Sequence, residues 1–393
     1  MTNRQLFLQH VAQTSDAPLA LEILKAEGMY LWDVSGKKYL DLIAGISVCN
    51  IGHSDPAVVK AVQQQAEQYM HLMVYGEFVE SPQVRYAGLL AEHLPEGLSS
   101  VYFTNSGAEA VEGAMKLVKR FTGRPGIIAF QKDYHGSTQG ALSIIGDEYW
   151  RNAYRPLLPG ITHLRYNQLE DLERITENTA GVIAETVQGE AGIIAADPEW
   201  LRRLRLRCTE TGALLVLDEV QAGLGRTGML WAFEQYGITP DVLIAGKALG
   251  GGMPLGAFMA APSIMEVLAS KPVLGHITTF GGHPVCCAAG MAAFERLLDG
   301  ELIPQVKNKE RLFLQGLRHE RIRKVRSSGL MIAVEFDSFE TNKKVIDRCI
   351  AGGVLTDWFL FAPECMRIAP PLIITDEQIQ MACQVIMEAV ASV

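Results

Sequence analysis

The middle of the chain alternates short apolar runs with segments of helical periodicity, and this alternation constrains the fold most. The apolar runs predict strands at residues 101–104, 127–130, 182–184, 213–217, 242–245 and 257–260. Between the third and fourth runs, Asp197 is placed to cap a helix, Pro198 suits its first turn and Gly212 suits its end. The pattern is typical of a mainly parallel α/β sheet with helices on its faces.

The two ends of the chain differ in character from the middle. Residues 29–33 and 38–42 predict a strand pair around a turn, and the C-terminal part carries helices and an apolar strand at 330–336. We therefore predict a large α/β domain at residues 49–289. A smaller α+β domain is expected from both ends, residues 1–48 and 290–393.

Composition excludes several classes of function. The net charge of -9 disfavours a nucleic-acid partner. The basic run 202–207 predicts a helix whose Leu201, Leu204 and Cys208 face inward while its arginines face solvent. The seven cysteines form no C-x-x-C pair, so we expect reduced thiols and no metal site. Without an apolar run of about 18 residues, we expect a soluble, cytoplasmic protein with no membrane partner.

Gly223, Gly225 and Gly228 spell G-x-G-x-x-G, the pattern of a dinucleotide-binding turn. That turn requires the first glycine directly after a strand and a long helix after the last. Here residues 218–221 separate the strand from the glycines, and the segment 229–237 is too short for such a helix. A nicotinamide-binding module is therefore a minor alternative.

Four features follow predicted strands and suit a phosphorylated heterocycle. Ser106, Gly107 and Ala108 lie where a strand passes into a helix, whose free N–H groups and dipole favour a phosphate; a plain serine cap is the alternative. Tyr134 follows another strand and offers a ring for stacking, although a core aromatic is the alternative, as a structural histidine is for His135.

The other two features are an acid and a lysine. Asp218 ends an apolar strand, where a buried carboxylate needs a partner such as a protonated ring nitrogen. Lys247 follows the next strand beside glycines 246 and 250–252, and a desolvated lysine can attack an aldehyde. A phosphate cup, a stacking ring, an aspartate and a lysine match the four groups of pyridoxal 5′-phosphate.

The chain resembles the class III aminotransferases of the fold type I pyridoxal-phosphate superfamily, and it is most similar to the acetylornithine and ornithine aminotransferase subgroup. The resemblance runs nearly end to end. It is carried by WDVSGKKYLDLIAGISVCNIGH, NSGAEAVEGAMKL, AETVQGEAG, LDEVQAGLGRTG, PDVLIAGKALGGGMPLGA, TTFGGHP and MRIAPPL.

The resemblance implies roles for the cofactor-binding residues. Lys247 would bond to the cofactor aldehyde and carry the proton, and Asp218 would keep the ring nitrogen protonated. Gln221 would bond near the ring oxygen, Val220 and Tyr134 would cover the ring faces, and Thr279 would reach the phosphate of the neighbouring subunit. A homodimer with shared active sites is therefore implied.

The resemblance also implies substrate-binding residues. Arg367 would hold the α-carboxylate of 2-oxoglutarate or glutamate, Glu190 would pair with Arg367 when the amine donor is bound, and Glu185 would line the site. Two residues depart from the family pattern: Ser137 replaces an arginine that acylornithine-type relatives use on the donor, and His283 replaces an asparagine. Either the donor lacks a carboxylate at that distance, or another arginine such as Arg151 or Arg155 substitutes for the missing one. The expected function is transfer of the terminal amino group of an acylornithine-like, ornithine-like or other omega-amino donor to 2-oxoglutarate, which gives glutamate; an aminomutase or a decarboxylase of the same fold is the alternative.

Overall fold

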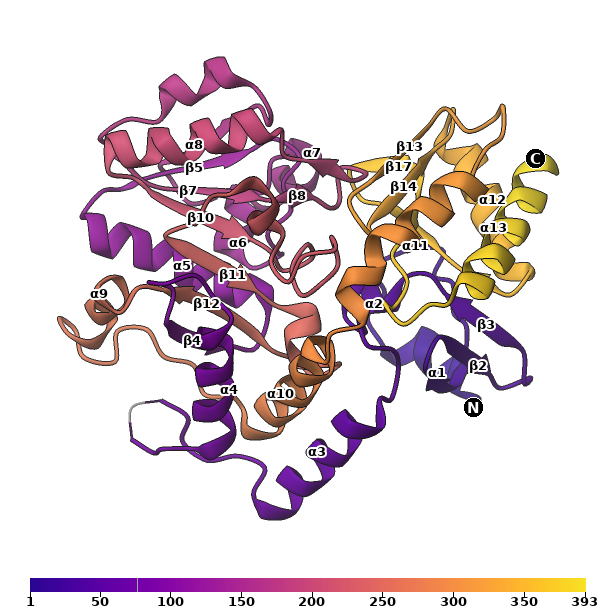
Figure 1. Ribbon diagram of the computed structural model, residues 1–393, viewed down its shortest axis with the longest axis horizontal. Helices are drawn as coiled ribbons and strands as arrows, with labels where there is room; N and C mark the ends of the chain where they lie inside the picture. The colour runs from indigo at the N-terminus through magenta and orange to yellow at the C-terminus, as the bar shows by residue number, and fades with distance from the viewer. Residues whose placement is uncertain (76) are drawn as a thin grey trace.

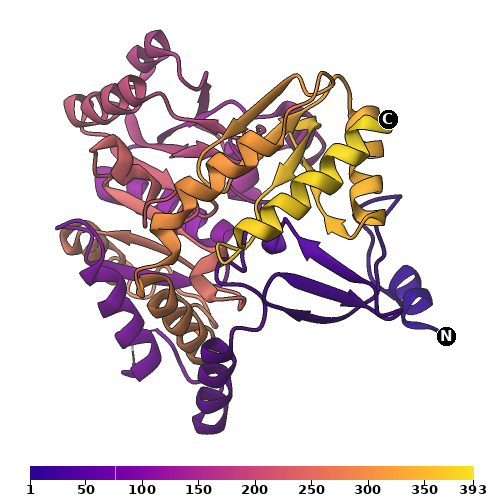
Figure 2. The ribbon, with the colours of Figure 1, turned by 45° about the vertical axis from the view of Figure 1, so that its right-hand side comes forward.

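The protein folds into two lobes in the computed structural model, which describes residues 1–75 and 77–393 (Figure 1). The larger lobe is built from the middle of the chain. Both chain ends lie in the smaller lobe, at the right of Figure 1, and they stay on that side in the turned view of Figure 2. None of the helices in the described residues combines the length and apolarity that a membrane crossing requires.

The sheet of the larger lobe has seven strands in the order β4-β12-β11-β10-β7-β5-β6. Six strands run in the same direction, and β12 is antiparallel to both of its neighbours. The strands are β4 (Ser100–Thr104), β5 (Gly126–Phe130), β6 (Ile161–Leu164), β7 (Thr179–Glu185), β10 (Leu214–Asp218), β11 (Val242–Ala245) and β12 (Gly256–Ala260). The predicted α/β class is confirmed. All six predicted strands are present, and β6 is an edge strand that the prediction missed.

Helices and short 3-10 turns surround this sheet. The helices are α3 (Pro56–Gln68), α4 (Ser81–Glu92), α5 (Gly107–Thr122), α6 (Gln139–Ile144), α7 (Glu148–Arg151), α8 (Pro198–Thr211), α9 (Pro262–Met265) and α10 (Pro284–Leu298). The 3-10 turns are η1 (Asn152–Tyr154), η2 (Leu169–Arg174), η3 (Ala232–Tyr236), η4 (Lys247–Gly250) and η5 (Glu266–Ala269), and β8 (Val187–Gln188) pairs with β9 (Ile194–Ala195).

The predicted capping of α8 is confirmed. Asp197 accepts hydrogen bonds from the N–H groups of the first turn, and Gly212 ends the helix with a φ of 69°. Leu201, Leu204 and Cys208 are buried, as the periodicity predicts. The arginines on the other face of α8 form ion pairs with Glu173, Glu210 and Asp241, which agrees with a solvated helix face.

The smaller lobe holds two four-stranded sheets. The first has the order β1 (Ile23–Glu27), β2 (Tyr30–Asp33), β3 (Lys38–Asp41), β15 (Val354–Leu355), and the second β13 (Lys324–Ser327), β14 (Ile332–Glu335), β17 (Ala362–Ile368), β16 (Asp357–Phe359). The predicted N-terminal strand pair is β2 and β3. Because β15 pairs with β3, both chain ends join one sheet. The helices of this lobe are α1 (Asn3–His10), α2 (Ala44–Ser47), α11 (Leu302–Gly316), α12 (Phe339–Ala351) and α13 (Asp376–Ala391).

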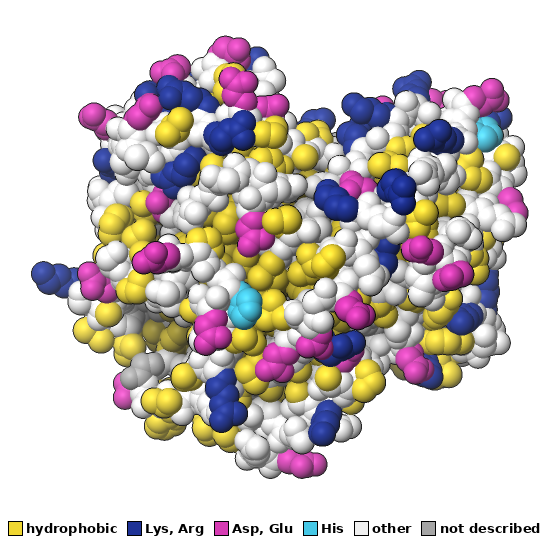
Figure 3. Space-filling model, viewed as in Figure 1, with side chains coloured by type: hydrophobic (Ala, Val, Ile, Leu, Met, Phe, Trp, Pro, Cys, Tyr) yellow, Lys and Arg dark blue, Asp and Glu magenta, His cyan; other side chains and the backbone are white. Residues whose placement is uncertain are grey.

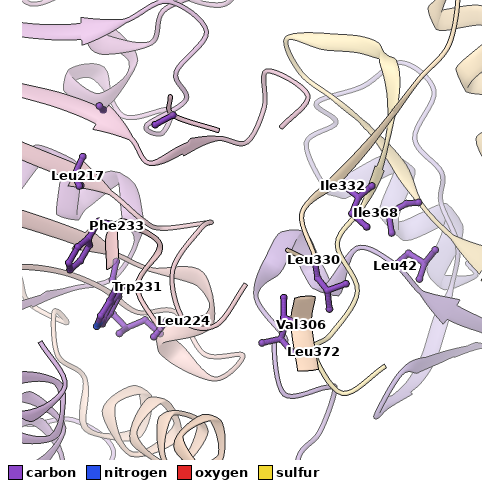
Figure 4. Packing of buried hydrophobic residues seen from close by; sticks show 14 of the residues in the cluster. Leu42, Leu217, Leu224, Trp231, Phe233, Val306, Leu330, Ile332, Ile368 and Leu372 are labelled. Atoms are coloured by element: carbon purple, nitrogen blue, oxygen red, sulfur yellow. The ribbon is translucent and has the colours of Figure 1, made fainter. Parts of the chain in front are cut away.

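One buried apolar cluster spans both lobes. Figure 4 shows Leu217, Trp231 and Phe233 on the side of the large sheet, and Leu330 and Ile368 on the side of the smaller lobe. The domain boundaries remain a prediction, and α10 runs across the expected one at residue 290. On the face drawn in Figure 3, acidic and basic side chains are interspersed over the surface.

The loop at residues 223–228, which follows β10 and contains the G-x-G-x-x-G pattern, packs against the smaller lobe. Gly225 has a φ of 87°, and an added Cβ would lie 3.0 Å from side-chain atoms of Ile303 and Leu372. Arg226 is fully buried and donates hydrogen bonds to the carbonyl of Leu330 and to the side chain of Asn50. No long helix follows, so the loop is not a dinucleotide-binding turn, and it connects the lobes instead.

Candidate active site

A cavity of about 300 Å³ opens at the carboxyl ends of the parallel strands. This edge is where open α/β sheets bind ligands. The cavity is lined by Gly107, Ala108, Tyr134, His135, Gly136, Ser137, Glu185, Glu190, Asp218, Val220, Gln221 and Lys247. Nine of the predicted site residues are therefore brought together around one space.

The N-terminus of α5 forms one end of the cavity. Ser106 caps the helix, and its hydroxyl accepts a hydrogen bond of 3.2 Å from the N–H of Glu109. The N–H groups of Gly107 and Ala108 have no partner within the helix, as is general for a first turn. A Cβ on Gly107 would lie 2.9 Å from Val220, so glycine allows this close approach. Free N–H groups and the helix dipole together suit an anion such as a phosphate.

Asp218 ends β10 inside the cavity wall and is paired with His135. The Oδ2 atom of Asp218 lies 2.7 Å from Nδ1 of His135, and its Oδ1 atom accepts a hydrogen bond of 3.0 Å from the N–H of Val220. On the other side of the ring, Asp133 Oδ2 lies 3.4 Å from Nε2. Burial alone would lower the pKa of His135, but the two aspartates raise it to about 10. His135 therefore acts as a buried cation that orients Asp218, and not as a base.

Glu185 lines the cavity and is held by the backbone. Its two oxygens accept hydrogen bonds from the N–H groups of Tyr134, at 2.7 Å, and Gly189, at 2.9 Å. Burial and the charge of Asp133 raise its pKa well above the ordinary value. Because both oxygens are bound to the backbone, Glu185 supports the loop that carries Tyr134.

Lys247 lies two residues after the end of β11 and has a φ of 49°, which is unusual for a residue other than glycine. Strained backbone of this kind is retained where the surroundings impose it, often at functional sites. Burial lowers the pKa of Lys247, so a larger fraction of the amine is uncharged and nucleophilic. Gly246 precedes it, and an added Cβ there would lie 3.2 Å from Val220.

A second cavity of about 420 Å³ shares Tyr134, Glu190 and Lys247 with the first and extends to Arg367. Arg367 is only 3% exposed and Glu190 only 5%. Two hydrogen bonds of 2.9 Å join Nη1 and Nη2 of Arg367 to the two oxygens of Glu190. Although burial alone would raise the pKa of Glu190, Arg367 holds it below the ordinary value. The pair links a loop of the larger lobe to β17 of the smaller one.

Sequence reasoning missed Asp357, which also binds Arg367. Asp357 on β16 lies directly opposite Arg367 on β17, and its Oδ1 atom accepts a hydrogen bond of 2.9 Å from Nε. Burial raises the pKa of Asp357 to about 6, against the opposing effect of Arg367. The unbroken apolar run WFLF that follows Asp357 gives no alternation from which this pairing could be predicted.

Four other predicted or considered residues lie apart from the first cavity. Thr279 is on an exposed segment. Arg151 and Arg155 both bind Glu148, and Arg151 also contacts His163, so neither lines the two cavities. His283 precedes α10 and stacks on His71 at 5.6 Å. Neither arginine is among the residues that line the two cavities, and the substitution of either for the missing arginine stays a prediction.

The residues present fit pyridoxal phosphate. The cavity offers N–H groups for a phosphate, a carboxylate for a protonated ring nitrogen, apolar and aromatic walls, and a lysine for an aldehyde. Its volume is typical of a site for a small molecule. When bound, this cofactor serves as an electron sink for a carbanion beside the substrate nitrogen.

Comparison with known proteins gives the same result. Residues 11–390 match the family model described as "Aminotransferase class-III". The chain is 39% identical over 385 residues to an acetylornithine aminotransferase of Methanopyrus kandleri, with 97% of this chain and 96% of that one covered. It is 40% identical over 321 residues to a [LysW]-aminoadipate semialdehyde/glutamate semialdehyde transaminase of Sulfurisphaera tokodaii, covering 80% and 81% of the two chains.

Solved structures of transaminases have the same fold as this chain. The ornithine aminotransferase of Toxoplasma gondii superimposes with a TM-score of 0.92 at 30% identity, covering 99% of this chain and 94% of that one. An (S)-enantioselective omega-transaminase of Thermomicrobium roseum gives a TM-score of 0.91 at 28% identity, covering 99% and 97%. The chain belongs to the class-III aminotransferases, and it is a transaminase that depends on pyridoxal phosphate.

Proposed function

We propose that the protein moves the terminal amino group of an omega-amine donor, of the ornithine or acylornithine kind or another, to 2-oxoglutarate, with glutamate as the product. The observation that carries this proposal is the junction of the two cavities. Lys247 and Glu190 line both of them, so the reacting end of a substrate in the second cavity lies beside the cofactor space of the first.

The chain's own residues would hold the cofactor as follows. The N–H groups of Gly107 and Ala108 would bind the phosphate, with Ser106 fixing the start of α5. Val220 and Tyr134 would cover the ring faces, and Gln221 would bond near the ring oxygen. Asp218 would keep the ring nitrogen protonated, because His135 fixes the orientation of its carboxylate at 2.7 Å.

Lys247 would move the proton between the substrate carbon and the cofactor aldehyde carbon. Its lowered pKa supports this role, because a neutral amine can accept a proton. Burial of the surrounding strand ends excludes water and strengthens the electrostatic contacts in the site.

Arg367 and Glu190 would let one site accept two differently charged substrates. With Glu190 in place, the guanidinium is neutralised and an amine donor without a carboxylate at that distance can bind. When glutamate or 2-oxoglutarate enters, its carboxylate would take the place of Glu190 on the same pair of nitrogens.

We also infer a cytoplasmic homodimer in which Thr279 reaches the phosphate site of the partner. Thr279 is exposed, and so are nearby apolar side chains that suit an interface: Leu72, Met73, Phe78, Ile277 and Phe280. The seven free cysteines agree with a reducing compartment.

The test is a pair of half-reactions. Purified protein loaded with pyridoxal phosphate is mixed with glutamate or with N-acetylornithine, without keto acid, while the visible absorbance of the cofactor is followed. We expect conversion to the pyridoxamine form with glutamate. Release of carbon dioxide, or turnover that needs no keto acid, would instead support the decarboxylase or aminomutase alternative.

Rapid conversion with N-acetylornithine would mean that the absence of an arginine at Ser137 is compensated. An unchanged spectrum with N-acetylornithine, in protein that reacts with glutamate, would mean a transaminase with a different donor. Lys247→Ala provides the negative control, since it removes the amine that both half-reactions require.

A further inference from the structure

Two carboxylates of the second cavity bind the same guanidinium. Arg367 meets two carboxylates, because Glu190 occupies Nη1 and Nη2 while Asp357 accepts from Nε. The backbone carbonyl of Trp358 accepts a further hydrogen bond of 3.2 Å from Nη2. Four of the five N–H groups of the guanidinium are therefore used. While Glu190 is in place, one cation is shared between two anions.

The second oxygen of Asp357 is a free acceptor in this cavity. Asp357 contacts Arg367 through Oδ1, and no hydrogen bond joins Oδ2 to the residues that the structure describes. The side chain is 27% exposed and lines the cavity. A partly buried carboxylate without a full set of partners is costly, and a second cation beside it would relieve that cost.

Apolar side chains also line the second cavity. Ile46, Trp358 and Leu360 line the same cavity. Such surfaces can cover a methylene chain, and they offer no charge to a carboxylate at the far end of a donor. Arg151 and Arg155 are held by Glu148 outside this cavity.

We propose that Asp357 binds the second ammonium group of the amine donor, and that the preferred donors of this site are α,ω-diamines. This inference rests on the proposed function and names the donor class for it. One end of the diamine reacts beside Lys247, the methylene chain lies against the apolar wall, and the far ammonium donates to Oδ2 of Asp357.

The half-reaction balances without any further reactant. The reacting carbon of the diamine is oxidised to an aldehyde as its amino group passes to the cofactor, whose aldehyde carbon is reduced to an amine carbon. One water molecule supplies the aldehyde oxygen, and Lys247 is released as a free amine. The second ammonium takes no part in the chemistry, so its contribution is confined to binding.

The test compares 1,4-diaminobutane with 1-aminobutane in the cofactor-loaded protein. The two amines differ only in the second amino group, and the apparent second-order rate constant of the absorbance change is measured for each. A hydrogen bond between charged groups predicts an advantage of about tenfold to a hundredfold for the diamine. 1,3-Diaminopropane and 1,5-diaminopentane report which chain length fits.

Asp357→Asn should remove most of this advantage, measured as the ratio of the diamine rate constant to the 1-aminobutane rate constant within the same variant. Asp347→Asn is the matched control, because Asp347 is exposed on α12 and, among the described residues, pairs only with Lys343. A diamine no faster than 1-aminobutane in the unmodified protein, or an advantage that persists in Asp357→Asn, would overturn the inference. The first comparison needs no variant, so it holds even if Asp357→Asn folds poorly.

A separate readout is binding. 1,4-Diaminobutane is titrated calorimetrically into two cofactor-loaded proteins, the single variant Lys247→Ala and the double variant Lys247→Ala/Asp357→Asn. The double variant should bind the diamine more weakly, and equal binding would contradict the inference. The reaction with glutamate distinguishes failure of the donor class from failure of the proposed function. If glutamate converts the cofactor and diamines do not, the donor class is wrong; if glutamate also fails, the proposed function falls and the donor class with it.

Discussion

Replacing Glu190 with glutamine should make glutamate bind more tightly. In the unmodified protein a substrate carboxylate must displace Glu190 from two hydrogen bonds of 2.9 Å to Arg367. Hydrogen bonds to charged groups contribute about 1.5 to 3 kcal/mol each, so the pair is worth at least ~3 kcal/mol. The neutral amide of glutamine keeps one acceptor, worth ~1 kcal/mol. The difference of ~2 kcal/mol predicts roughly 30-fold tighter binding of glutamate in Glu190→Gln.

The assay is the dependence of the glutamate half-reaction rate on glutamate concentration, which gives the apparent dissociation constant. A diamine or another donor without a carboxylate gains nothing from this change, so its apparent constant serves as the control. Unchanged or weaker binding of glutamate to Glu190→Gln would refute the idea that Glu190 competes with the substrate carboxylate.

Three further changes test other parts of the site. The pKa of His135 is raised from 6.5 to about 10, so its ion pairs stabilise the fold fully below pH 6.5 and this stabilisation is lost as the pH rises to 10. The melting temperature of the cofactor-free protein should therefore fall between pH 7 and pH 9.5. In His135→Gln this fall should be smaller. Gly107→Ala should weaken cofactor binding about tenfold or more, because the new Cβ would lie 2.9 Å from Val220, whereas Gly88→Ala, with open space around it on α4, should leave the dissociation constant unchanged. Ser137→Arg should place a cation beside Tyr134. The ratio of the half-reaction rate with 4-aminobutyrate to that with 1-aminobutane should then rise several fold. An unchanged ratio would argue against an effect of this position on donor choice.

The larger sheet could be predicted because buried parallel strands are continuous apolar runs. Residues 214–217, LLVL, are all buried, and Asp218 ends the strand where the polarity changes. β6 could not be predicted in this way, since Thr162 and His163 interrupt a four-residue edge strand. The pairing of β15 with β3 could not be predicted from local hydrophobic periodicity either, because it joins residues more than 300 positions apart.

The cofactor side of the site follows from local sequence, because each of its residues lies at the end of a strand or the start of a helix. The substrate side depends on contacts between distant segments. Glu190 lies on a loop of one lobe and Arg367 on a strand of the other, so only the resemblance could suggest their pairing. Asp357 was missed because its role comes from the register of β16 on β17.

The most direct test of the account is to find which lysine bonds to the cofactor. The cofactor-loaded protein is treated with borohydride, digested and examined by mass spectrometry for the peptide that carries the reduced cofactor. We predict the added mass on Lys247, with none on the buried Lys309. Attachment at any other lysine, or no attachment in protein that has bound the cofactor, would contradict the assignment of Lys247 on which the proposed function rests.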